Sequence, residues 1–127
     1  MATPRILAID DVHIEARCAL RDPTVTFYRD LLGLEQLDEA APSDRLVFRG
    51  AVRSGPRLRV NLIEEALEES MRRDAHLLVD DLAEMAGLLA EHRMEIQWSR
   101  GWSYYDRRIP VQDPSGNRLE LVSAHAW

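Results

Sequence analysis

Apolar and polar positions in the first half of the chain follow the strand period, then the helix period, then the strand period again. Residues 6–18 predict a single strand, in which polar and apolar residues alternate from Asp11 to Cys18. Asp22 as the N-cap, Pro23 at the first helical position and Gly33 at the end then delimit a predicted helix. Three further strands are predicted at residues 34–37, 45–48 and 58–63.

The same order returns after a polar, acidic stretch at residues 64–73. Residues 75–79 predict a strand, and Asp81 with Glu84 three residues later is typical of the capping box that begins a helix. Three more strands are predicted at residues 95–98, 106–111 and 118–122. A duplicated order of elements indicates an internal repeat in which neither half buries its sheet face alone.

We therefore predict an α+β fold made of two βαβββ modules, from about residue 6 to 64 and from about 73 to 123, within one domain spanning residues 1–127. The strands are expected to form one partly closed, barrel-like sheet around a cavity. Single residues repeat as well, because Asp11-Val12-His13 corresponds to Asp74-Ala75-His76 and Val60-Asn61-Leu62-Ile63 corresponds to Leu119-Glu120-Leu121-Val122. The repeat predicts that the first and last strands of both halves meet around one concave surface.

The last predicted strand carries a carboxylate, Glu120, between two leucines. Before it, Asp113-Pro114-Ser115-Gly116-Asn117 predicts a tight turn, because proline presets φ while glycine and asparagine accept positive φ. Leu119 and Leu121 are expected to face a core, which places Glu120 on the opposite face. A carboxylate in the middle of an apolar strand must be compensated, so Glu120 is predicted to be either paired or functional.

Composition narrows the classes of function. The chain has 127 residues and a net charge of −6, which argues against nucleic acid as a partner because phosphate binding needs a basic face. It has no apolar run long enough for a membrane span and no signal-peptide pattern, so we expect neither. The single cysteine, Cys18, excludes an intrachain disulfide and predicts a reducing, cytoplasmic location. All 16 basic residues are arginine, so lysine chemistry is absent and an anionic ligand would be held by guanidinium groups.

Two segments carry a resemblance to a known family: Phe27-Tyr28-Arg29-Asp30-Leu31-Leu32-Gly33-Leu34-Glu35 and Asp113-Pro114-Ser115-Gly116-Asn117-Arg118-Leu119-Glu120-Leu121. Val79-Asp80-Asp81-Leu82 is a weaker third match. With these segments the chain resembles the vicinal oxygen chelate superfamily. That superfamily includes glyoxalases, extradiol dioxygenases, methylmalonyl-CoA epimerases, fosfomycin resistance enzymes and bleomycin resistance proteins. The resemblance implies a glyoxalase-like fold, which hosts several chemistries.

In metal-using relatives, side chains from the first and last strands of each half hold a divalent ion. Glu120 falls on the last-strand ligand position, and Asn61 falls on its equivalent in the first half. When the first half is aligned with the family through Phe27-Tyr28, His13 falls on a ligand position. Alignment through other segments places Asp11 and Asp74 on the ligand positions instead. The resemblance thus predicts His13, His76 and Glu120 as ligands of Zn, Ni, Mn, Co or Fe. The alternative is that both histidines line a polar cavity that holds no metal.

The resemblance implies a metal-dependent enzyme that acts on a small substrate with neighbouring oxygens, as an isomerase, lyase, transferase or dioxygenase. Glu120 is the candidate for moving a proton, and Glu15 is the second candidate. Candidate substrate-binding residues are Asn61, Arg107, Arg108, Trp102 and Tyr104. The alternative function is a metal-free protein of the bleomycin resistance type that binds or sequesters a small molecule. In either case we expect a homodimer, because relatives of this length commonly pair.

Overall fold

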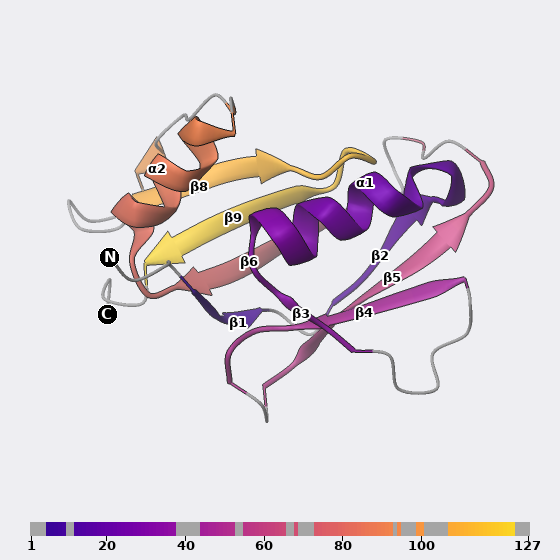
Figure 1. The fold of residues 1–127 in the computed structure, drawn as a ribbon, viewed down its shortest axis with the longest axis horizontal. Helices are drawn as coiled ribbons and strands as arrows, with labels where there is room; N and C mark the ends of the chain where they lie inside the picture. Colours follow the sequence, from indigo (N-terminus) through magenta and orange to yellow (C-terminus); the bar gives the residue numbers. More distant parts are fainter. Residues whose placement is uncertain are drawn as a thin grey trace.

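The computed structural model describes residues 5–9, 12–37, 44–52, 55–65, 68, 73–92, 94, 99–100 and 107–123. These residues form two β-sheets and two helical segments, which confirms the predicted α+β class (Figure 1). The expectation of one continuous, partly closed sheet is corrected, because the described strands divide into two separate sheets.

Each sheet contains one copy of the repeated strand order. The first has the order β2 (Val12–Arg17), β5 (Arg57–Ile63), β4 (Arg45–Arg49) and β3 (Glu35–Gln36). The second contains β6 (Asp74–Val79), β9 (Arg118–Ser123), β8 (Arg107–Gln112) and β7 (Ser99–Arg100) in the same sense. The first and last strands of each set are parallel neighbours, and the remaining pairs are antiparallel.

One further strand, β1 (Ile6–Ile9), joins the second sheet as the antiparallel neighbour of β6. The single strand predicted at residues 6–18 is therefore wrong, because its two parts belong to different sheets. β1 also contacts the end of the first sheet, since Ala51 N donates to Ile6 O over 2.8 Å and Val52 N to Leu7 O over 3.1 Å. The apolar run Ile6–Ile9 precedes the alternating residues of β2 without a glycine or proline between them, and so the sequence gave no sign of the change of sheet.

The first helical segment begins earlier than predicted. A 3₁₀ turn at Cys18–Leu20 leads into α1 (Arg21–Val25), which continues as a wider π-helical stretch at Thr26–Leu31. The residue before α1 is Leu20, so the prediction of Asp22 as the N-cap is wrong, and Asp22 lies in the first turn. Gly33 ends this segment with a φ of +76°, a backbone conformation that glycine accepts without strain.

The second helix, α2 (Leu82–Glu91), begins as its sequence predicts. The Asp81 side chain accepts a hydrogen bond from the Glu84 backbone N–H over 3.0 Å, which satisfies one of the otherwise unpaired N–H groups of the first turn. α2 contacts β9, and α1 contacts β2. The predicted strand at residues 95–98 lies outside the described residues.

The core lies between these helices and the inward faces of the two sheets. Alternate residues of the central strands are buried there, among them Leu58, Val60, Leu77, Leu119 and Leu121. Tyr28 packs from the first helical segment onto Phe48 of β4, with ring centroids 5.3 Å apart. The other faces of the sheets consequently carry the polar members of each alternation, which include most of the predicted site residues.

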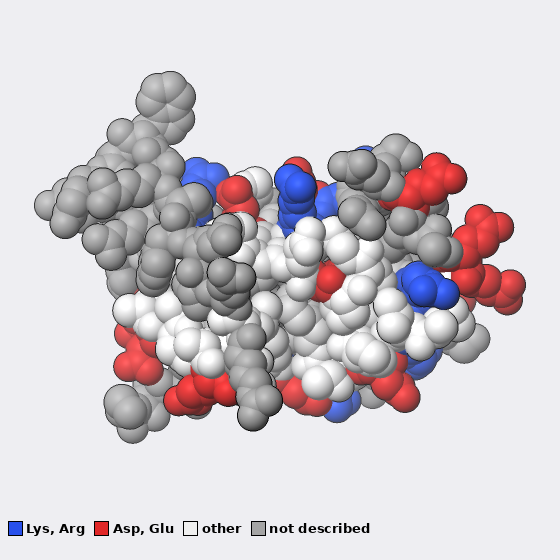
Figure 2. Space-filling model, turned by 90° about the horizontal axis from the view of Figure 1, so that it is seen from above, with Lys and Arg blue, Asp and Glu red and all other residues white. Residues whose placement is uncertain are grey.

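Charge is unevenly distributed over the surface. Figure 2 shows one face, on which acidic side chains gather at one end and along one edge, while uncharged residues fill much of the middle. No helix among the described residues is long and apolar enough to cross a membrane.

Candidate functional site

The polar face of the second sheet brings together three of the predicted site residues. The parallel register of β6 and β9 places His76 directly beside Glu120 and Asp74 beside Arg118. Arg108 comes from β8, on the other side of β9. Ala75, Leu77, Leu119 and Leu121 are buried on the opposite face, so the alternation of both strands fixes His76 and Glu120 on this one.

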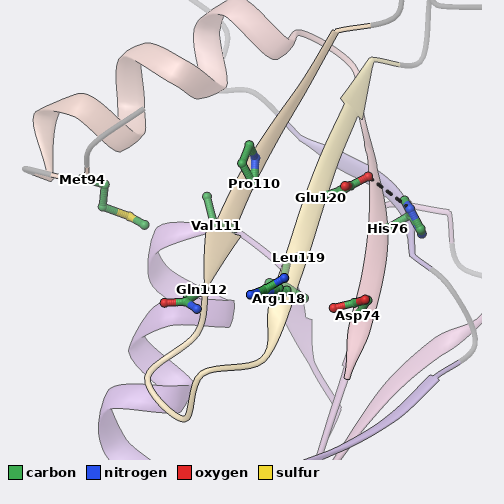
Figure 3. A pocket seen from close by; sticks show the side chains of 9 residues that line it. All are labelled: Asp74, His76, Met94, Pro110, Val111, Gln112, Arg118, Leu119 and Glu120. Atoms are coloured by element: carbon green, nitrogen blue, oxygen red, sulfur yellow. Dashed lines mark ion pairs between the residues drawn. The ribbon is translucent and has the colours of Figure 1, made fainter. Parts of the chain in front are cut away.

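Glu120 is paired, which is one of the two outcomes, paired or functional, that its position in an apolar strand predicted. Arg108 Nη1 donates to Glu120 Oε2 over 2.8 Å. His76 Nε2 lies 3.2 Å from the same oxygen (Figure 3). The exposed fractions of the side chains are 33% for Arg108, 38% for Glu120 and 51% for His76. Water therefore screens these contacts, and they position the side chains more than they stabilise the fold.

A cavity of about 530 Å³ opens beside this group. Its lining residues are Asp74, His76, Met94, Pro110, Val111, Gln112, Arg118, Leu119 and Glu120 (Figure 3). A second cavity of about 370 Å³ is lined by Ala8, Ile9, His76, Leu77, Leu78, Arg108 and Val122. His76 lines both cavities, so a polar pocket and a mainly apolar pocket meet at this side chain. Both volumes lie in the range typical of small-molecule sites, which is about 300–1,000 Å³.

The remaining predicted residues of the first half lie on the first sheet. His13 is exposed on β2 beside Arg59 of β5, and the half-buried Glu15 lies beside Asn61. The amide oxygen of Asn61 accepts a hydrogen bond from Arg45 Nε over 3.1 Å. The first-sheet counterpart of the His76–Glu120 pair is thus Glu15–Asn61 in register. The predicted correspondence of His13 with His76 is therefore wrong by two residues, because His13 takes the place of Asp74.

The structure does not gather His13, His76 and Glu120 into one group. Among the described residues of this chain, no three His, Cys, Asp or Glu side chains are placed to hold a metal ion together. His76 and Glu120 provide two donors, and the Oε2 atom of Glu120 already accepts from Arg108. The described donors of one chain therefore do not fit a three-ligand centre, and the predicted metal site stays a prediction.

Three predicted residues cannot be placed in this site. Trp102 and Tyr104 lie outside the described residues, and Arg107 is described only by its backbone in β8. Arg118 and Gln112 line the first cavity without having been predicted as site residues, and Asp74 was predicted only as an alternative metal ligand. Asp74 and Arg118 share the parity of His76 and Glu120, so alternation could have identified them. Gln112 could not be found in this way, because its position depends on the pairing of β8 with β9.

A buried turn fixes the start of β9 and thereby the position of Glu120. Asp113 Oδ1 accepts from the backbone N–H groups of Ser115 and Asn117, each over 2.9 Å. Its Oδ2 accepts from Asn117 Nδ2 over 2.9 Å and from the Tyr28 hydroxyl over 2.6 Å. Burial, and then the charge of Asp113, raises the pKa of Tyr28 well above its usual value, so the hydroxyl remains a donor.

The same turn connects the second half of the chain to the first. Asn117 Nδ2 donates to the backbone oxygen of Glu15 over 2.8 Å, and Arg17 N donates to Ser115 Oγ over 3.1 Å. Gly116 adopts a φ of +92°, as the turn-forming sequence predicted. The turn therefore holds β2 and β9 in a fixed relation.

Sequence comparison identifies the family. The model of the glyoxalase/bleomycin resistance protein/dioxygenase superfamily matches residues 12–121. The chain belongs to this superfamily. The match begins at β2, so β1 lies outside it. No curated protein sequence matches the chain.

Several solved structures have a fold similar to that of this chain. A glyoxalase family protein from Bacillus anthracis aligns with a TM-score of 0.71 at 19% identity, covering 93% of this chain and 95% of its own. A lactoylglutathione lyase from Agrobacterium tumefaciens aligns with a TM-score of 0.68 at 19% identity, with coverages of 91% and 92%. An antibiotic-binding protein from a Streptomyces species aligns with a TM-score of 0.61 at 16% identity, with coverages of 87% and 92%. At such identities the likeness shows the fold alone, which both enzymes and binding proteins share.

Proposed function

We propose that this superfamily member binds a small molecule through Arg108 and His76, in the two cavities that meet beside Glu120, without using a metal ion. The observation that carries the proposal is the 2.8 Å contact between Arg108 Nη1 and Glu120 Oε2. The guanidinium gives Glu120 the positive charge that a divalent ion would otherwise supply. Arginine does not lose its charge at any ordinary pH, so a metal ion at Oε2 would compete with the guanidinium for that oxygen.

The shape and polarity of the site support a binding role. The first cavity has acidic, basic and amide side chains in its lining, whereas Ala8, Leu78 and Val122 form much of the second. Such a combination suits a ligand with oxygen acceptors at one end and an apolar surface at the other. The antibiotic-binding protein from Streptomyces shows that a fold of this kind can hold an organic molecule.

The second candidate is the metal-dependent enzyme, which the convergence of His76 Nε2 and Glu120 Oε2 favours. Two of the three predicted ligands lie side by side, 3.2 Å apart. A lactoylglutathione lyase is among the structural neighbours, which supports an enzyme as an alternative in this fold. This function needs a third donor to join His76 and Glu120, and in a homodimer the candidate is His13 of a second copy.

Metal titration separates the two candidates. We expect protein purified without chelators to contain far less than one metal ion per chain, and Glu120→Gln to bind added Zn²⁺ or Ni²⁺ as the wild-type protein does. Near-stoichiometric metal that is lost in Glu120→Gln would instead establish the second candidate.

Ligand binding tests the first candidate directly. Bleomycin and aromatic antibiotics can be screened by the shift that each causes in the melting temperature. We expect a ligand that stabilises the wild-type protein to lose its effect in Arg108→Met. The matched control is Arg5→Met, which removes an exposed arginine that pairs with Asp80 over 3.6 Å and that lines neither cavity. A ligand that stabilises both variants equally would contradict binding at Arg108.

We further propose that the chain is one domain of two modules, about residues 6–64 and 73–123, and that it assembles as a cytoplasmic homodimer. The pairing of β1 with β6 moves the start of the first-module sheet to Val12. Light scattering tests the assembly, and a monomer mass would contradict it.

A further inference from the structure

The polar face of the first sheet is rich in arginine although the chain is acidic. The burial patterns of β2, β4 and β5 alternate, with the apolar residues buried and the others directed to the opposite face. That opposite face carries five arginines, which are Arg17, Arg45, Arg49, Arg57 and Arg59. Its carboxylates among the described residues are Glu15 and Glu35. Five positive charges against two negative ones make this face basic in a chain whose net charge is −6.

Two of these arginines lie directly opposite each other. Arg49 of β4 pairs in register with Arg57 of β5. Directly opposed residues of an antiparallel pair have Cβ atoms about 4.5–5.5 Å apart, and like charges at this separation destabilise a sheet. Arg59 lies two residues beyond Arg57 on the same face, at a separation of about 6.8 Å. The register of β4 and β5 therefore concentrates positive charge at one place.

Arg49 has a second unusual feature. Its Nη2 atom donates to Glu35 on β3, but its Nε atom is buried and has no hydrogen-bond partner among the described residues. The exposed fraction of this side chain is only 14%. A buried donor without an acceptor is unfavourable, and in native proteins such a group often marks the place of a bound ion or water.

The backbone beside Arg49 is held firmly in place. A Cβ atom added to Gly50 would lie 2.7 Å from Leu7 O, so β4 ends in direct contact with β1. The hydrogen bonds from Ala51 and Val52 to β1 fix the same segment. The charged group is therefore carried by a rigid scaffold, which reduces the entropy lost on binding a ligand.

From these observations we propose that Arg49, Arg57 and Arg59 form a binding site for an oxyanion, either a carboxylate or a phosphate group of a small molecule. The oxyanion accepts from the Nε atom of Arg49 and from the guanidinium of Arg57, and it neutralises the opposed charges. Planar guanidinium groups suit both kinds of oxyanion because their N–H groups match two oxygens at once. This site uses no residue of the second-sheet cavities, so it does not depend on the function proposed above.

Calorimetric titration with sodium phosphate and with sodium malonate at low ionic strength tests the site and distinguishes the two sources of oxyanion. We expect one saturable site in the wild-type protein, with affinity reduced about tenfold or more in Arg57→Gln. Arg57→Lys should give an intermediate affinity, because it keeps the charge and loses the fork of donors. The matched control, Arg29→Gln, removes an exposed arginine of the first helical segment that pairs with Asp30, and it should bind as the wild type does.

A stability measurement adds an independent readout. Without added anion, Arg57→Gln should melt at a higher temperature than the wild-type protein because the opposed charges are relieved, and Arg29→Gln should not. Phosphate or malonate should then stabilise the wild-type protein more than Arg57→Gln. Equal affinities in these two proteins, or no saturable binding of either anion to the wild type, would overturn the proposal. Binding of a single-stranded oligonucleotide without binding of either small anion would overturn it as well.

Discussion

Tyr28 and Asp113 join the two halves of the chain through a buried hydrogen bond of 2.6 Å between the phenolic hydroxyl and Oδ2. Tyr28 is fully buried against Phe27 and Phe48, and Asp113 begins the turn before β9. One contact therefore connects the helical segment of the first half to the strand that carries Glu120.

Replacing Tyr28 with phenylalanine should lower the free energy of unfolding by about 1.5–3 kcal/mol, because a hydrogen bond to a charged acceptor is lost in the interior. Urea denaturation measures this change. Asp113→Asn should destabilise the protein further, since the Asp113 carboxylate accepts four hydrogen bonds. An unchanged urea midpoint in Tyr28→Phe would show that the contact contributes nothing to stability.

The same tyrosine predicts a loss of stability in alkali. The pKa of Tyr28 is raised well above its usual value of 10.0, first by burial and then by Asp113. The unfolded chain therefore releases this proton before the folded protein does. The stabilisation is complete below pH 10.0 and is lost as the pH rises toward the folded pKa, at about 1.4 kcal/mol per pH unit. Urea midpoints measured across this range should fall more steeply for the wild-type protein than for Tyr28→Phe, and parallel curves would contradict the prediction.

Two glycines provide a matched test of the contact between β4 and β1. Gly50→Ala should destabilise the protein by about 1–3 kcal/mol, because its Cβ atom would meet the backbone oxygen of Leu7 at 2.7 Å. Gly87 lies in the interior of α2, and a Cβ atom added there would meet no atom within 4 Å outside the backbone of its own helix. Gly87→Ala should therefore stabilise the protein by about 0.5–1 kcal/mol. Equilibrium denaturation of both variants measures the difference, and equal effects would argue against a close approach at Gly50.

The pair of Arg108 and Glu120 should couple only weakly in stability. About one third of each side chain is exposed, so a double-mutant cycle with Arg108→Met and Glu120→Gln should give about 0.5–1 kcal/mol at low salt. The coupling should decrease at high ionic strength because water and ions reach both groups. A coupling of about 3 kcal/mol or more would mean that the pair is effectively buried.

Local patterns in the sequence predicted much of the fold. Alternation identified β4, β5, β6 and β9, and the Asp81–Glu84 capping signal marked the start of α2. Asp22 followed by Pro23 suggested a helix start that the structure places earlier, because the turn at Cys18–Leu20 leads directly into α1. The division of residues 6–18 between two sheets depends on the later partners of β1, which no local pattern contains.

The site was predicted in part for the same reason. Glu120 was expected to be paired or functional, and the register of β6 and β9 places His76 beside it. Arg107 and Arg108 were both candidate substrate-binding residues, and the contact of Arg108 with Glu120 depends on the pairing of β8 with β9. The opposition of Arg49 and Arg57 was not predicted either, because it arises from the exact register between β4 and β5.

The position of β1 has a consequence for the order in which the protein is built. β1 precedes the other described strands, yet its partner β6 opens the second half. During translation β1 therefore has no partner strand until the whole first half and β6 have been synthesised. Once in place it covers the free edge of β6, which would otherwise be open to pairing with a strand of another molecule. Loss of these first residues should thus appear as aggregation of newly made protein.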